Sequence, residues 1–200
     1  MSKPEPLQYG QYYHIYNRGN NGETLFRERR NYLYFLGLYA KYIEPIAGTF
    51  AYCLLRNHFH FLVQIKDWSK DWQCSEHCQS LQPSRAFSNL FSTYTKAFNK
   101  AYQRTGSLFE KPFKRKLVAS DRYFVALVVY IHKNPQRHHF VDDLVDWPFS
   151  SYHAILSDKP SRIQRADVLD WFGSRSSFQA VHSARLDETS IEPLIMDDWT

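Results

Sequence analysis

Apolar residues recur along the chain with two periods, one typical of strands and one typical of helices. Runs rich in β-branched and aromatic residues, and one short basic run, predict four strands: 12–17, 48–55, 58–65 and 115–119. Apolar stripes with i, i+3, i+4, i+7 spacing predict three helices: 28–43, 83–104 and 121–134. Ser120 or Asp121 would cap the third helix, and Pro135 would end it.

The order of these elements is β-α-β-β-α-β-α, and the first six match the split β-α-β pattern of ferredoxin-like proteins. The sequence therefore predicts an α+β fold, a ferredoxin-like four-stranded antiparallel sheet with an additional helix that bears Tyr130. A core domain would span 1–150, and a small acidic extension would span 151–200. Short helices are expected in that extension, near 150–157, 167–172 and 176–186.

Composition narrows the class of protein. The 200 residues are 44% hydrophobic and 17% aromatic, which excludes a disordered chain and indicates a well-filled core. The longest apolar run, 124–131, is far shorter than the roughly 20 residues that cross a bilayer, so no membrane partner is expected. The start of the chain lacks the apolar core of a signal peptide and there are only three cysteines, which predicts a cytoplasmic location.

Charge is divided unevenly along the chain. Residues 1–140 carry a net charge of +11 and residues 141–200 a net charge of −6, so the overall +5 hides a basic body and an acidic tail. A basic body favours a nucleic-acid partner, because Lys and Arg displace counterions from phosphates, although a solvated basic surface is the alternative. The tail would either compete with DNA for the basic surface or be an ordinary solvated extension.

Two histidines stand at i and i+2 in the predicted strand 58–65. Strand alternation puts His58 and His60 on one face and Phe59 and Phe61 on the other. Paired imidazoles suit a divalent metal, but an H-x-H motif alone equally fits two half-exposed strand histidines.

The third predicted helix supplies chemistry that could join this pair. Tyr130 and Asn134 are four residues apart and so share a helix face, away from the centre of the apolar stripe. Asn134 offers a carbonyl oxygen as a third ligand, and Tyr130 offers a phenol beside it. Each residue alone has an ordinary explanation, packing for the tyrosine and a turn for the asparagine before proline.

Six segments, in a specific order and spacing, resemble a known family. They are YHIYNRGN (13–20), NYLYFLGLY (31–39), YCLLRNHFHFLV (52–63), YTKAFNKAYQRTGSLFEKPFKRKLV (94–118), YIHKNP (130–135) and WPFSSY (147–152). In these segments the chain resembles the single-tyrosine HUH transposases of bacterial insertion sequences and the repeat-associated tyrosine transposases related to them. The resemblance makes 1–150 an HUH transposase-like catalytic domain.

The resemblance implies a DNA transposase that cleaves and rejoins hairpin-bearing single-stranded DNA. Tyr130 would be the catalytic nucleophile, and His58, His60 and Asn134 would hold Mg²⁺ or Mn²⁺. The intermediate would be a 5′-phosphotyrosine, which conserves the energy of the phosphodiester. Family members include dimers and monomers, so the resemblance leaves a homodimer open.

Basic residues suggest where DNA would lie. Segment 96–116 interleaves Lys and Arg with phenylalanines, as in surfaces that bind single strands, although a solvated helix and a charged edge strand are the alternative. The DNA-binding candidates in this segment, in the first loop and around the tyrosine helix are Arg18, Asn20, Lys96, Lys100, Arg104, Lys111, Lys114, Arg115, Lys116, Arg122, Lys133 and Arg137.

The polar loop 66–82 contains a weaker motif. Cys74, His77 and Cys78 have spacing that suggests zinc, but no convincing fourth ligand stands nearby, so free thiols are expected.

Two other functions compete with the transposase. A transposase-derived protein could bind hairpin DNA without cleaving it. A metal-dependent hydrolase is disfavoured, because no Asp or Glu lies near either motif to activate water.

Overall fold

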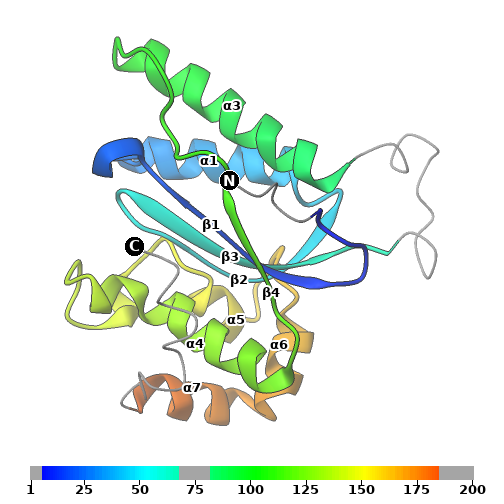
Figure 1. Cartoon of the computed structure of the whole chain (residues 1–200). Helices are drawn as coiled ribbons and strands as arrows, with labels where there is room; N and C mark the ends of the chain where they lie inside the picture. Colours follow the sequence, from blue (N-terminus) through cyan, green and yellow to red (C-terminus); the bar gives the residue numbers. More distant parts are fainter. Residues whose placement is uncertain (1–5, 68–81, 185–200) are drawn as a thin grey trace.

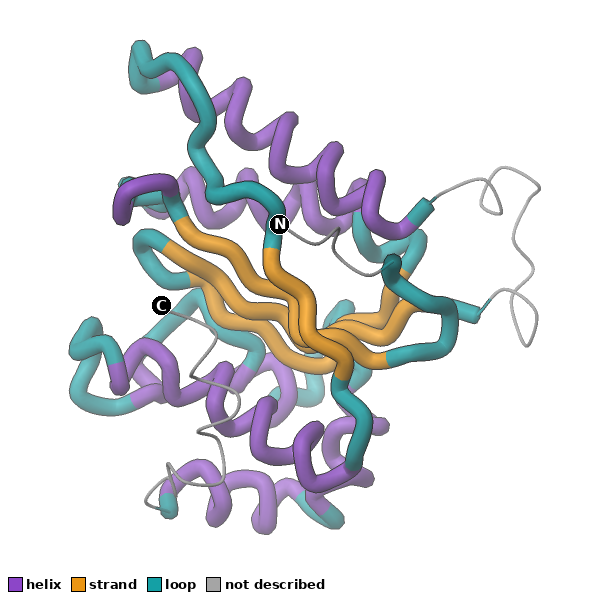
Figure 2. The backbone as a smooth tube through the Cα atoms, viewed as in Figure 1, coloured by secondary structure: helices purple, strands orange, loops and turns teal. Residues whose placement is uncertain are grey.

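The computed structural model describes residues 6–67 and 82–184 of the chain. Within it, β1 (Tyr12–Arg18), β2 (Ala47–Leu54), β3 (His58–Ile65) and β4 (Lys114–Leu117) form one sheet. The strand order is β2-β3-β1-β4 and every pairing is antiparallel (Figures 1 and 2). This order is that of a split β-α-β fold, so the predicted fold class is confirmed.

Helices cover both faces of the sheet. On one face lie α1 (Arg29–Tyr42) and α3 (Pro83–Ala101) (Figure 1). On the other lie α4 (Asp121–Arg137), α5 (Tyr152–Leu156), α6 (Arg165–Phe172) and α7 (Arg175–Ser183). Two short 3₁₀ turns, η1 (Asn20–Gly22) and η2 (Leu144–Asp146), belong to the connections. The sheet therefore separates two layers of helices, and side chains of its strands point into one layer or the other.

The face under α1 and α3 is an aromatic core. Phe59 and Phe61 of β3 point into it, and Phe35 of α1 packs between their rings, at centroid distances of 5.3 and 6.4 Å. Phe35 also meets Tyr94 of α3 edge to face, at 5.1 Å. All four side chains are almost fully buried. Burial of these apolar side chains is thus enough to explain why α1 and α3 pack on this face of the sheet.

The ends of two helices differ from the prediction. The expectation that Pro135 ends the third helix is wrong, because α4 continues to Arg137 with Pro135 inside it. In the last turn a proline removes little beyond the one bond to the carbonyl of Ile131, and the N–H of His138 still bonds to Asn134. At the other end, Ser120 accepts from the N–H of Tyr123 and caps the helix, as predicted.

The expected second helix, 83–104, ends early, at Ala101. Gln103 follows with a φ of 51°, a left-handed conformation that an α-helix cannot contain.

Residues 151–184 pack against the core. The backbone N–H of Ser151 bonds to the carbonyl of Tyr52 at 2.9 Å, and Ile163 forms an isolated bridge with Thr49 of β2. The domain boundary at residue 150 stays a prediction. These 34 residues carry four basic and three acidic side chains, so the acidity of the extension is concentrated in 185–200. Residues 185–200, and with them the competition hypothesis, lie outside the described residues, as do Cys74, His77 and Cys78.

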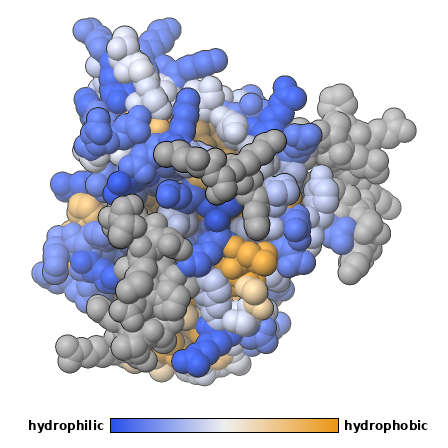
Figure 3. Space-filling view, in the orientation of Figure 1, coloured by the Kyte–Doolittle hydropathy of each residue, from blue (hydrophilic) through white to orange (hydrophobic). Residues whose placement is uncertain are grey.

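The surface of the described residues is mainly polar. In Figure 3 hydrophilic side chains dominate the visible face, and apolar ones gather in small patches. No helix within 6–67 and 82–184 is long and apolar enough to cross a membrane.

Candidate active site

Strand alternation directs the two histidines of β3 toward α4. The rings of His58 and His60 lie 5.3 Å apart between centroids, and the ring of His60 meets that of Tyr130 edge to face at 5.5 Å. Phe59 and Phe61 point to the opposite, aromatic face, as the alternation predicts. The sheet therefore brings both imidazoles against the helix that carries the phenol.

Helix α4 adds the amide. Its turn geometry sets Asn134 beside Tyr130, and Asn134 Nδ2 donates to the carbonyl oxygen of Tyr130 at 3.1 Å. Asn134 also lies close enough to His58 to influence its pKa, which burial lowers. The exposed fraction is 2% for His58, 1% for His60 and 0% for Tyr130 and Asn134. All four side chains singled out from sequence thus meet in one buried cluster, although helix periodicity suggested a less buried position for Tyr130 and Asn134.

The cluster also contains three residues that the sequence analysis did not single out. His14 of β1 shares a hydrogen bond with His60, with His14 Nε2 and His60 Nδ1 2.9 Å apart. Asn57 Oδ1 accepts from His58 Nδ1 at 2.8 Å, and the ring of His138 lies 4.7 Å from that of His58. The position of His14 could have been predicted from the sequence. A ferredoxin-like sheet places the first strand beside the third, and strand alternation then puts His14 on the same face as His60.

Burial keeps these imidazoles neutral. It lowers the pKa of His58 and of His14 to about 3, with smaller effects from His138 on His58 and from Lys116 on His14. Burial, then repulsion from the neighbouring histidines and Arg137, lowers the pKa of His60 well below 6.5. A neutral imidazole keeps a lone pair on one nitrogen, which is the form that binds metal ions.

The donor atoms fit a divalent cation. Among the described residues, His60 Nε2 and Asn134 Oδ1 are buried without a hydrogen-bond partner, an arrangement that costs free energy unless something else fills it. No group of three His, Cys, Asp or Glu side chains suited to a metal occurs in 6–67 and 82–184. A third protein ligand in this cluster would therefore be the Asn134 amide oxygen.

Three of the candidate DNA-binding residues lie at this cluster. Arg18, Lys116 and Arg137 are near enough to lower the pKa values of His58, His14 and His60, respectively. The Arg137 guanidinium also lies 5.2 Å from the centre of the Tyr130 ring. Arg18 also forms an ion pair with Glu110.

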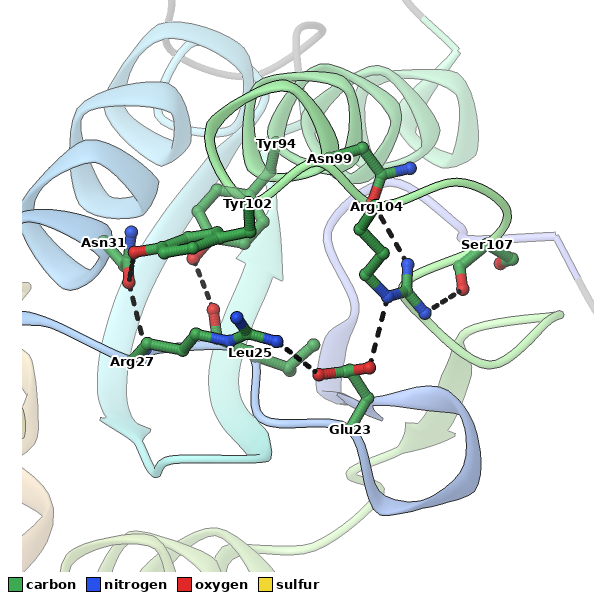
Figure 4. Close-up of polar contacts among 9 residues, drawn as sticks. All are labelled: Glu23, Leu25, Arg27, Asn31, Tyr94, Asn99, Tyr102, Arg104 and Ser107. Atoms are coloured by element: carbon green, nitrogen blue, oxygen red, sulfur yellow. Dashed lines mark hydrogen bonds and ion pairs between the residues drawn. The ribbon is translucent and has the colours of Figure 1, made fainter.

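Other candidates are engaged in holding the fold together. Figure 4 shows Arg104 in a polar network, where it donates to Glu23 at 3.1 Å and to the carbonyl of Ser107 at 3.0 Å. Asn20 donates to the same carbonyl at 3.2 Å. Lys133 is buried and donates to the carbonyl of Ala184 after α7, so the structure does not bring it to the cluster.

The remaining candidates divide between the two faces of the sheet. Arg115 points to the α3 face, where it donates to Ser84 at 2.8 Å. With Lys96 and Lys111 it lines a groove of about 840 Å³ between α3 and the segment before β4. Lys100 is exposed on α3, Lys114 on β4 and Arg122 on α4. The basic segment 96–116 is therefore not one continuous track, because β4 alternates between both faces.

Comparisons with known proteins identify chains of similar sequence and similar fold. No family model matches the chain. A curated protein of Haemophilus influenzae, named "Putative REP-associated tyrosine transposase", is 27% identical over 105 residues, which are 52% of this chain and 58% of that protein. The chain therefore matches somewhat more than half of the length of this relative.

A solved structure shares the fold. It is a REP-associated tyrosine transposase bound to a REP hairpin, superposable with a TM-score of 0.58 at 16% identity, over 80% of this chain and 88% of that one. The chain is thus similar in sequence to a protein named as a putative REP-associated tyrosine transposase, and it shares the fold of a solved REP-associated tyrosine transposase.

Proposed function

We propose that the protein is a single-strand DNA transposase that cleaves and rejoins hairpin-bearing DNA through Tyr130. The observation that carries the proposal is the convergence of this phenol with His58, His60 and Asn134 in one buried cluster. His60 Nε2 and Asn134 Oδ1 have no partner there among the described residues, although both are fully buried. Unsatisfied polar atoms at such a place indicate a functional site rather than packing.

The phenol oxygen of Tyr130 would attack the phosphorus of a phosphodiester in line with the leaving group. The bond from phosphorus to the 3′ oxygen breaks, the phenol gives up its proton to solvent, and the departing 3′ oxygen takes up a proton from solvent and becomes a hydroxyl. The products are a 5′-phosphotyrosine and a free 3′-OH, and attack by another 3′-OH reverses the step on a new strand. His58, His60 and Asn134 would hold Mg²⁺ or Mn²⁺, which supplies charge stabilisation at the phosphate when bound.

Positive charge supports DNA as the substrate. Lys116 and Arg137 lie beside the cluster, where they can meet the phosphate on either side of the scissile bond. The relative of known structure is described as bound to a REP hairpin, which supports hairpin DNA for this chain as well.

A second candidate function is hairpin binding without cleavage. The observation that favours it is the complete burial of Tyr130, whose exposed fraction is 0%. A phosphate can reach this phenol only after α4 or its neighbours move. Cleavage therefore requires an opening step that binding alone does not need.

The test is covalent trapping. The full chain is incubated with hairpin-bearing single-stranded DNA and Mn²⁺, and denaturing electrophoresis separates the protein–DNA adduct. We expect an adduct with the wild type, none with Tyr130→Phe, and none when EDTA removes the metal. Tyr34→Phe, which changes an exposed tyrosine of α1 on the opposite face, serves as the matched control and should form the adduct.

Each outcome separates the candidates. An adduct in Tyr130→Phe would contradict the assignment of the nucleophile. Tight hairpin binding without adduct or cleavage would favour the binding function. Cleavage without adduct would favour a hydrolase, although none of the charges that shift the pKa values of His14, His58 and His60 is a carboxylate.

A further inference from the structure

His14 lies on β1 beside His60, outside the set of residues that would hold the metal. Its exposed fraction is 0%, and its Nε2 is 2.9 Å from His60 Nδ1, with the two ring planes 22° apart. The two rings are therefore nearly coplanar and joined edge to edge by one hydrogen bond. A bond of this geometry fixes the rotation of the His60 ring and couples the position of its proton to that of the His14 proton.

The position of that proton decides whether His60 can bind a cation. In one tautomer His60 Nδ1 donates to His14, and His60 Nε2 keeps its lone pair. In the other, His14 Nε2 donates to His60, and His60 Nε2 carries a hydrogen that blocks coordination. His60 Nε2 is buried without a partner among the described residues, so a ligand at this atom would select the first tautomer.

Asn57 determines the tautomer of His58 in a similar way. Its amide oxygen carries no hydrogen, so it can only accept from His58 Nδ1, at 2.8 Å. The lone pair of a neutral His58 is then on Nε2. His58 and His60 thus each have a possible acceptor at Nδ1. Asn57, in the turn before β3, provides it for His58, and His14 of β1 provides it for His60.

We infer that His14 is a positioning residue, which accepts a hydrogen bond from His60 Nδ1 and so presents His60 Nε2 to a divalent cation. The inference rests on the proposed function, because it needs a cation at His58, His60 and Asn134. Lys116 lies directly across from His14 on β4, so β1 is held between the strand that carries His60 and the strand that carries this lysine.

The test measures metal affinity rather than activity. Mn²⁺ is titrated into the full chain without DNA, and binding is followed by electron paramagnetic resonance. His14→Phe keeps a ring but loses the acceptor, and we expect affinity to fall by about 10–100-fold. His14→Gln restores an acceptor oxygen and should recover part of the loss.

Tyr39→Phe is the control for a lost buried hydrogen bond. The Tyr39 hydroxyl is 2.8 Å from Thr49 Oγ1 and its ring packs under α1, on the other face of the sheet. This variant should bind Mn²⁺ as the wild type does. Unchanged affinity in a folded His14→Phe would overturn the role of His14 alone, whereas no Mn²⁺ binding by the wild type would overturn the metal site and the proposed function with it.

A second measurement does not depend on any variant folding. Long-range ¹H–¹⁵N spectra of the wild type distinguish the two neutral tautomers of each histidine. With Mg²⁺ bound, we expect His60 to carry its proton on Nδ1. A proton on His60 Nε2 under these conditions would contradict the inference.

Discussion

The two faces of the sheet are built on different principles. Under α1 and α3, aromatic rings such as Phe35, Phe59 and Phe61 fill most of the space, and buried hydroxyls such as that of Tyr94 find hydrogen-bond partners. Under α4, the same strand presents His58 and His60, which are as deeply buried, and His60 Nε2 has no hydrogen-bond partner among the described residues. The first face supplies stability, and the second gives up part of it for chemistry.

The largest expected effect tests the aromatic face. Phe35 is fully buried among five aromatic rings, so Phe35→Ala removes apolar contacts and leaves a cavity. We expect the free energy of unfolding to fall by about 3–5 kcal/mol, measured by urea denaturation. A loss below about 1 kcal/mol would mean that this face does not carry the stability of the fold.

An effect of intermediate size concerns pH. Burial lowers the pKa of His182 on α7 from 6.5 to about 4, so the folded protein keeps this group neutral while the unfolded chain protonates it. Stability is then fully present above pH 6.5 and is lost as the pH falls from 6.5 toward 4. One such histidine contributes a slope of about 1.4 kcal/mol per pH unit.

The variant His182→Leu isolates this contribution. Urea denaturation between pH 7 and pH 5 should show a shallower loss of stability than in the wild type, by about the slope of one histidine. The variant also loses the hydrogen bond between His182 and His132, but it does so at every pH. This loss lowers the whole curve of stability against pH and does not alter its slope. Parallel curves would show that His182 does not titrate on unfolding.

A smaller effect is expected for the network of Figure 4. Arg104 joins the end of α3 to Glu23, and its side chain remains 21% exposed, so solvent weakens the ion pair. Arg104→Ala should cost about 1 kcal/mol of unfolding free energy, and Lys100→Ala, an exposed position in the last turn of α3, should cost less. Equal losses would indicate that the network adds nothing to stability.

The smallest effect on stability is expected at the polar face. Asn134→Leu removes a buried oxygen that has no partner among the described residues, so the free energy of unfolding should stay within about 1 kcal/mol of the wild type. Mn²⁺ affinity should nevertheless fall at least about 10-fold. This is the smallest loss expected for a residue that only supports a ligand, and Asn134 would itself be a ligand. A large loss of stability with unchanged Mn²⁺ affinity would reverse the roles given to the two faces.

Local pattern was enough to predict much of this arrangement. Alternation placed His58 and His60 on one side of β3, and helix spacing placed Tyr130 above Asn134, because both depend only on backbone geometry. The order of elements predicted the sheet, which the structure confirms.

Contacts between distant segments were harder to predict. His14 reaches the cluster only through the pairing of β1 with β3, and Lys133 turns to the carbonyl after α7, which no local pattern encodes. The burial of Tyr130 was missed for the same reason, because its ring lies against His14 and His60, which come from two distant strands. Pro135 misled the prediction because its cost depends on where in the helix it stands.

The central claim is that Tyr130 is the nucleophile, and mass spectrometry of the trapped adduct tests it most directly. Trypsin should release the peptide from Tyr123 to Lys133, which contains both tyrosines of α4. The account predicts that fragmentation places the 5′-phosphonucleotide on Tyr130. A nucleotide on Tyr123 or on any other residue would contradict it.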